Sequence, residues 1–221
     1  MPSFLGHPRV NTVLLPAPVY ATWNPAGTNP NITLSDWNLT AQVTGPNTAN
    51  AYTLSASGGG NFDDGKRYFE VRTVSLGGAA GSISIGFADS DLDPGGAELG
   101  DLPWGYAWRG DGVKKSNGIA NSLGVVLVPG SIIMIAISSY VYLGQATAKI
   151  WFGENGVWFD GGNPSVNENP AFDGAIASSA TDWGVRASLK TNGDRIMANF
   201  GGSPFMYNPP SGFSAGWGLG V

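Results

Sequence analysis

The chain has 221 residues, of which 42% are hydrophobic and only 12% are charged. Eight Trp, seven Tyr and ten Phe supply ample apolar surface for a core, which argues against a disordered chain. The formal net charge of −5 argues against sequence-independent binding to nucleic acid, because such binding needs a basic patch. The absence of cysteine excludes disulfides, thiolate metal sites and a cysteine nucleophile.

Residues 1–19 differ in composition from the remainder of the chain. Four prolines surround a short apolar piece, Val10–Leu15, and proline donates no hydrogen bond to a β-ladder. We therefore expect an extended N-terminal arm over residues 1–19, followed by one domain over residues 20–221. A neighbouring subunit or the domain surface would hold this arm through its apolar side chains, which are Phe4, Leu5, Val10, Val13, Leu14 and Leu15.

The start of the chain also lacks a basic stretch followed by an apolar stretch, so we expect no signal peptide. The longest apolar run, Gly124–Ile137, is interrupted by Pro129 and Gly130 and is too short to span a bilayer. The sequence therefore predicts a soluble protein with no membrane partner.

From Ile32 onward, apolar and polar residues alternate with a period of two, which is typical of half-buried strands. A turn at Ser35–Asn38 joins the first two expected strands, Ile32–Leu34 and Leu39–Val43. The strands expected in chain order are Ile32–Leu34, Leu39–Val43, Ala51–Ser55, Arg67–Val74, Ser82–Ala88, Trp104–Arg109, Ile132–Ile137, Trp183–Leu189, Ile196–Phe200 and Phe205–Tyr207. No long segment keeps a helical period with helix caps. The pattern predicts an all-β, antiparallel two-sheet β-sandwich.

The clearest hairpin signal lies at Asn155-Gly156, because both residues tolerate the positive φ that a two-residue turn demands. Lys149–Phe152 is the expected incoming strand and Val157–Phe159 the return strand. An aromatic-rich hairpin of this kind is expected to lie buried between two sheets.

The order of these segments resembles the SPRY (B30.2-like) domain, a concanavalin-like sandwich of two bent antiparallel sheets. The resemblance spans residues 30–215 and rests on Lys66–Val71, Ile83–Ala88, Trp104–Trp108, Gly130–Ile137, Ala148–Phe159, Asn169–Phe172, Asn199–Gly201, Pro204–Tyr207 and Pro209–Phe213. Two departures are Ser138-Ser139, where the family usually has an acidic residue, and an inserted loop at Tyr140–Gln145. The glycine-rich form with an Asn-Gly-Val-Trp hairpin resembles modules of bacteriophage and bacterial proteins. The resemblance implies a binding or structural role.

The sequence gives little support for an enzyme. A glycosidase needs two carboxylates that face one cleft, and none of the four glutamates lies in a Glu-x-Asp-x-x-Glu strand. We expect Glu70 to pair with its same-face neighbour Arg72. The only histidine, His7, lies in the arm, where it has no partner for a triad. We therefore predict no catalytic residues and no cofactor.

Asp89, Asp91 and Asp93 resemble the start of a calcium loop. Pro94 stands where an EF-hand needs glycine, and Gly100 stands where it needs glutamate. Two interpretations remain, namely a calcium site of another kind and an acidic loop whose aspartates cap turns.

A second candidate site combines three aromatic residues at a spacing of two, Trp104, Tyr106 and Trp108. If their common face is the inner one, they belong to the core. If it is the outer one, they form a ledge for a sugar or peptide. The ledge would also contain Arg109, Asp111 and Lys114, and the doublet Lys114-Lys115 is otherwise expected to be solvated turn charge.

These features favour a non-enzymatic structural protein of a bacteriophage virion, assembled in the host cytoplasm. It would decorate the capsid or tail, bind other virion proteins through its arm, and contact a glycan or protein of the host surface. It would act as a homo-oligomer or as part of a larger assembly. The alternative is a free-standing carbohydrate- or peptide-binding module of a bacterium. A polysaccharide-degrading enzyme is the third hypothesis.

Overall fold

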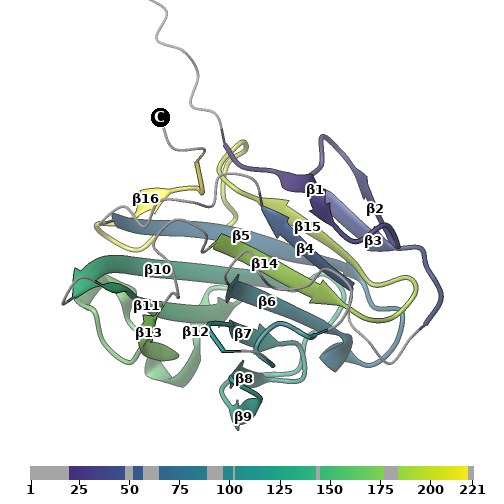
Figure 1. Ribbon diagram of the computed structural model, residues 1–221. Helices are drawn as coiled ribbons and strands as arrows, with labels where there is room; N and C mark the ends of the chain where they lie inside the picture. Colours follow the sequence, from purple (N-terminus) through teal and green to yellow (C-terminus); the bar gives the residue numbers. More distant parts are fainter. Residues whose placement is uncertain are drawn as a thin grey trace, which may run out of the picture.

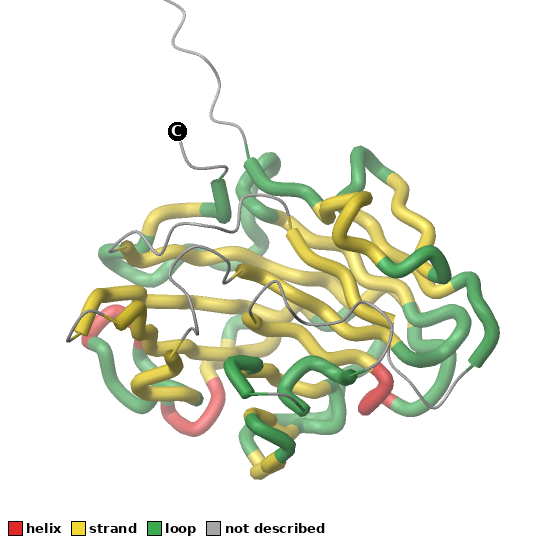
Figure 2. The backbone as a smooth tube through the Cα atoms, in the orientation of Figure 1, coloured by secondary structure: helices red, strands yellow, loops and turns green. Residues whose placement is uncertain are grey.

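The computed structural model describes residues 20–47, 52–56, 65–88, 97–101, 103–142, 145–176 and 184–218. In these ranges the chain forms two stacked β-sheets (Figure 1). The only helical segments among the described residues are three short 3-10 turns, coloured red in Figure 2, at Ala80–Ser82 (η1), Phe159–Gly161 (η2) and Pro164–Val166 (η3). The prediction of an all-β sandwich is confirmed.

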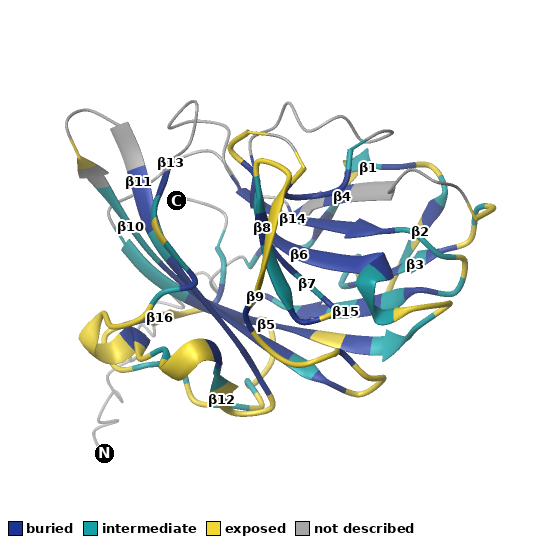
Figure 3. Cartoon of the chain, turned by 90° about the horizontal axis from the view of Figure 1, so that it is seen from below, coloured by how far each residue is buried: buried dark blue, intermediate teal, exposed yellow. Residues whose placement is uncertain are grey.

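The first sheet has seven described strands. In spatial order they are β1 (Trp23–Thr28), β4 (Tyr52–Ala56), β14 (Gly184–Leu189), β6 (Ile83–Ala88), β7 (Tyr106–Arg109), β8 (Val113–Ser116) and β9 (Ile119–Ser122). Every pairing within it is antiparallel. The last strand, β9, is exposed along its whole length (Figure 3).

The second sheet has nine described strands. Seven of them follow one another in the order β12 (Val157–Trp158), β11 (Gln145–Glu154), β10 (Ile132–Tyr142), β5 (Gly65–Ser75), β15 (Arg195–Asn199), β3 (Thr40–Val43) and β2 (Ile32–Ser35). Two lie off this path, β13 (Phe172–Ile176) beside β11 and β16 (Ser214–Ala215) beside β5. The pairing of β16 with β5 is parallel, and the others are antiparallel.

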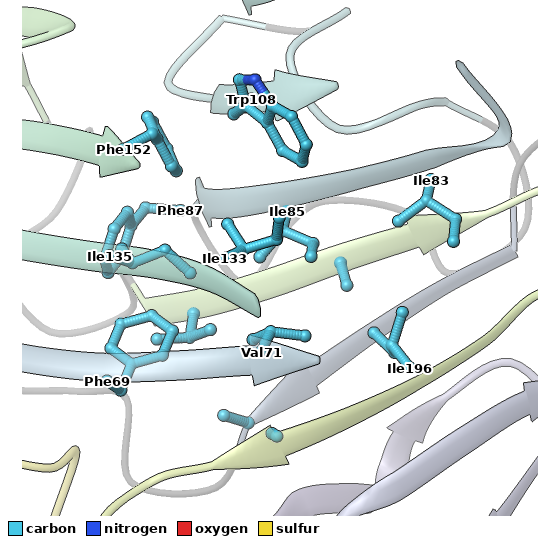
Figure 4. Packing of buried hydrophobic residues seen from close by; sticks show 14 of the residues in the cluster. Phe69, Val71, Ile83, Ile85, Phe87, Trp108, Ile133, Ile135, Phe152 and Ile196 are labelled. Carbon is cyan, nitrogen blue, oxygen red and sulfur yellow. The ribbon is translucent and has the colours of Figure 1, made fainter. Parts of the chain in front are cut away.

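Alternation along the strands places one set of side chains between the two sheets. On β5, Phe69 and Val71 enter the main core, whereas Tyr68 and Glu70 lie on the opposite, outer face. Figure 4 shows the inner rings and branched side chains of both sheets packing together; Phe69 and Phe87, from opposite sheets, have ring centroids 6.0 Å apart. The period of two along β5 thus separates core side chains from outer-face side chains.

Two Asn-Gly turns join neighbouring strands into hairpins, of which one was predicted. Asn155 (φ 49°) and Gly156 (φ 88°) join β11 to β12, as predicted, although Phe159 already belongs to η2. Asn117 (φ 50°) and Gly118 (φ 74°) join β8 to β9 in the same way. The second hairpin follows from the same signal and was not predicted.

A smaller apolar cluster lies on the outer face of the nine-stranded sheet. Tyr68, Met134, Ala136, Trp151 and Phe213 are its buried members. Phe205 and Tyr207 pack against it from the segment before Phe213. The prediction of a strand at Phe205–Tyr207 is wrong, because the backbone N–H groups of Met206 and Tyr207 donate to a side chain instead of a ladder.

The predicted loop at Tyr140–Gln145 is also wrong in extent. Strand β10 continues to Tyr142 and β11 begins at Gln145, so these two residues pair with each other across the hairpin. The ladder continues through the pairs Ser138–Lys149, Ser139–Ala148 and Tyr140–Thr147.

The arm predicted over residues 1–19 lies outside the described residues, and the described chain begins at Tyr20. Tyr20 pairs with Gly218, and the backbone N–H of Ala21 donates to Trp217. The two ends of the described chain therefore lie side by side. Within the described ranges, no helix is long and apolar enough to cross a membrane.

Candidate functional site

The fold places the three aromatic residues of the predicted ledge in different environments. Trp108 is fully buried in the main core, with its ring centroid 5.7 Å from that of Phe159, so it is not available to a ligand. Tyr106 is half-buried and packs edge-on against Phe172. Trp104 precedes β7, has φ 66° and is 42% exposed. The predicted strand over Trp104–Arg109 is thus too long, and its three rings do not share one exposed face.

The polar members of the predicted ledge point to different neighbours. Arg109 lies on the outer face of β7, opposite to Trp108, and binds Asp111 through two hydrogen bonds of 2.8 Å. This pairing raises the pKa of Arg109 and lowers that of Asp111, in both cases chiefly through the hydrogen bonds. The Lys114 ammonium donates to the carbonyl of Ala171 at 2.8 Å. The six predicted residues therefore do not form one continuous surface.

A buried ionic cluster lies on the outer face of the seven-stranded sheet and is centred on Glu98. One carboxylate oxygen accepts from the Ser84 hydroxyl at 2.8 Å, and the other lies 3.3 Å from Lys115 and 3.1 Å from Lys190. The Arg109 guanidinium is 3.9 Å away. Ser84 lies on β6, Lys115 on β8 and Arg109 on β7, and Lys190 directly follows β14. One carboxylate therefore contacts side chains from four parts of the sheet.

This cluster fastens the segment 97–101 onto the sheet. Leu99 is fully buried with Ala88 and Ala107, and its backbone N–H donates to the Ser188 hydroxyl at 2.9 Å. The interpretation of Lys115 as a solvated turn charge is wrong, because the side chain is buried and reaches Glu98 and Asp101. The sequence carries one usable signal, the alternation of Val113 to Ser116, which turns Lys115 to the face opposite Lys114.

Glu70 holds the C-terminal segment against the nine-stranded sheet. It is buried and accepts the Tyr68 hydroxyl at 2.8 Å and the backbone N–H groups of Met206 and Tyr207 at 2.9 and 2.8 Å. The predicted ion pair with Arg72 is wrong, since Glu70 makes no ion pair with any described residue. Buried carboxylates need such donors, and backbone N–H groups supply them here.

Replacing Tyr68 by phenylalanine should lower the free energy of unfolding by about 1.5–3 kcal/mol, the usual contribution of a hydrogen bond to a charged group. Burial, with help from Glu70, raises the pKa of Tyr68 well above its ordinary value. Because tyrosine in the unfolded chain loses its proton near pH 10, this residue contributes stability below about pH 10 that declines as the pH rises further.

Urea unfolding at neutral and alkaline pH measures both effects. The loss of stability above about pH 10 should be smaller in Tyr68→Phe than in the parent protein. Tyr142→Phe is the matched control, because Tyr142 is 63% exposed and should change neither quantity. Identical alkaline profiles for parent and Tyr68→Phe would contradict the assignment.

A groove of about 340 Å³ lies on the outer face of the nine-stranded sheet. It lies beside residues 203–206, at the start of the C-terminal segment that covers this face. Its lining residues are Asp36, Leu39, Glu70, Arg72, Ile132, Met197, Ala198, Asn199, Ser203, Pro204, Phe205 and Met206. Most of these are apolar, which is typical of small-ligand sites. Arg72 is exposed, and its side chain makes no hydrogen bond or ion pair with any described residue. No local sequence pattern indicates this groove, since its residues come from four separate segments.

No protein-family model matches this chain, and the comparison with curated proteins finds no match. Among solved structures, a human SPRY domain has a TM-score of 0.58 and 18% identity, covering 80% of this chain and 99% of its own. The SPRY domain of human HERC1 has a TM-score of 0.56 and 13% identity, covering 80% and 96%. The chain has a SPRY-like fold. At these identities the likeness concerns the fold of this SPRY-like domain and not its ligand.

The SPRY-like domain contains no group of three or more potential metal-ligating side chains within its described ranges. Asp89, Asp91 and Asp93 lie outside these ranges, so the calcium loop stays a prediction. The described residues of the SPRY-like domain thus offer two distinct polar features, the closed Glu98 cluster and the open groove beside Arg72. Only the groove is accessible to a ligand.

Proposed function

We propose that this SPRY-like domain is a non-enzymatic binding module of a bacteriophage virion, where it decorates or attaches the capsid or tail. The observation that carries the binding role is the use of its buried carboxylates. Three of the four buried carboxylates among the described residues have structural partners: Glu70 and Asp194 accept backbone N–H groups, and Glu98 binds Lys115. Hydrolysis of a sugar polymer needs two carboxylates free to act on a substrate in one cleft.

The virion part of the proposal is supported by sequence features. The glycine-rich chain with its Asn-Gly-Val-Trp hairpin resembles modules attached to phage and bacterial surface components. Residues 1–19 would act as an arm that binds other virion proteins through Phe4, Leu5, Val10, Val13, Leu14 and Leu15. This arm would leave the domain at Tyr20, beside Gly218. The Arg72 groove would contact a glycan or protein of the host surface.

Deletion of residues 1–19 should abolish incorporation into particles and leave a folded domain. The domain retains its core because Tyr20 and Ala21 still pair with the C-terminal segment. Incorporation is measured by quantifying the protein in purified particles, and folding by the thermal unfolding of the isolated truncated protein. Normal incorporation of a folded truncated protein would contradict the role of the arm.

The groove also favours a second candidate function, a free-standing carbohydrate- or peptide-binding module of a bacterium. Such a module would bind its ligand with the same affinity whether or not residues 1–19 are present. Release of reducing sugar from a polysaccharide would overturn both proposals in favour of an enzyme.

A further inference from the structure

The turn between β2 and β3 displays a tryptophan in a strained backbone conformation. Asp36, Trp37 and Asn38 have φ values of 52°, 61° and 62°, so three consecutive residues occupy the left-handed region. Asp and Asn tolerate this region because their short polar side chains bond locally, but a bulky aromatic residue does so only rarely. Trp37 is nevertheless 92% exposed and gains almost no burial in return.

The surrounding structure holds this turn in place. The backbone N–H of Leu39 donates to Asp36 at 3.1 Å, and that of Trp23 donates to Asn38 at 2.8 Å. The indole N–H of Trp23, which is buried, donates to the carbonyl of Leu39 at 3.0 Å. Arg195 adds an ion pair with Asp36 at 3.7 Å. A strained turn that is fixed from several sides and exposes its largest side chain is typical of a functional site.

Trp37 stands next to the Arg72 groove in the chain, although it is not one of the lining residues. Its neighbour Asp36 lines the groove, and consecutive Cα atoms are only about 3.8 Å apart. The groove offers the Asp36 carboxylate, which also contacts Arg195 and the Ser35 hydroxyl, and the Arg72 guanidinium, which has no partner among the described residues. Met206, which is 67% exposed, supplies part of an apolar wall.

We propose that the groove binds a short saccharide, with Trp37 packing on a sugar ring and Asp36 and Arg72 binding its hydroxyl groups. This assignment rests on the binding role proposed above and names the ligand class. An aromatic face complements the apolar face of a sugar ring, and sugar hydroxyls donate to a carboxylate while they accept from a guanidinium.

The geometry favours a saccharide over the other ligand classes. Three charged residues line the groove, the acidic Asp36 and Glu70 and the basic Arg72, which provides no net attraction for a polyanion such as nucleic acid. The groove is concave, and its volume falls within the range of small-ligand sites rather than that of a flat protein interface.

The test uses the full chain on a printed array of bacterial and mammalian oligosaccharides, followed by calorimetric titration with the oligosaccharides that bind. Trp37→Ala should weaken binding about tenfold or more and leave the melting temperature unchanged, because the ring buries almost nothing. Trp104→Ala is the matched control and should bind as the parent does. Arg72→Gln should weaken binding, whereas Arg67→Gln, on the same strand but outside the groove, should not.

Several results would overturn the saccharide assignment. These are no binding to any oligosaccharide, equal binding by the parent and Trp37→Ala, loss of binding in Trp104→Ala, and a lowered melting temperature in Trp37→Ala. Binding of a host protein through Trp37 without binding of oligosaccharides would also overturn it. Incorporation into particles is measured in a separate experiment. A negative result for saccharide binding therefore does not contradict the virion role, and a negative result for incorporation does not contradict the saccharide site.

Discussion

Replacing Trp108 by alanine should lower the free energy of unfolding by about 3–5 kcal/mol, the usual loss for a buried tryptophan. The side chain is fully buried between the sheets and packs against Phe159. Its removal leaves a cavity in a core whose neighbours, on both sheets, are already fixed in position. Chemical denaturation followed by fluorescence or circular dichroism measures the change.

Trp104→Ala is the control for this prediction. Trp104 is partly exposed and precedes the strand, so its removal should cost about 1 kcal/mol or less. Equal losses in the two variants would mean that the placement of β7 is wrong. The comparison also decides between the core and the ledge as the role of Trp108.

Replacing Glu98 by glutamine should destabilise the domain by about 3 kcal/mol, because it removes one partner of a buried ion pair. Glutamine keeps the shape of the side chain but loses the charge that Lys115 faces at 3.3 Å. Lys190 is more exposed and can regain water, and Arg109 retains Asp111. Most of the cost therefore falls on the buried Lys115, which keeps only the more exposed Asp101 as an ion-pair partner.

Glu168→Gln provides the matched control, since Glu168 is exposed and its change should stay within about 0.5 kcal/mol. Urea denaturation of both variants measures the difference. Limited proteolysis should also cut Glu98→Gln faster near residues 97–101, where the cluster fastens the chain. Parent-like stability and proteolysis of Glu98→Gln would show that the cluster contributes nothing to the fold.

Sequence patterns predicted most of the scaffold because they are local. Alternation on β5 separated Phe69 and Val71 from Tyr68 and Glu70, and Asn155-Gly156 located a hairpin. Both signals depend on backbone geometry that each residue type adopts by itself. The Asn117-Gly118 hairpin carries the same information and could have been predicted on the same ground.

The site was less predictable because its contacts join distant segments. Glu70 looked like a partner for Arg72, its neighbour on the strand, but the fold brings the backbone of residues 206 and 207 to it instead. Lys115 was expected to be a solvated charge, but the fold brings it into ion pairs with Glu98 and Asp101. These choices depend on which loop covers which face of a sheet.

By itself, the sequence determined that this protein is a two-sheet sandwich, since alternating apolar residues and turn-forming pairs act within a few residues of each other. Only the tertiary structure decided that Trp108 is core, that Glu98 is an internal counter-ion, and that Trp37 stands exposed beside an open groove. Burial and ion pairing depend on residues far apart in the chain. No local pattern records where those residues meet.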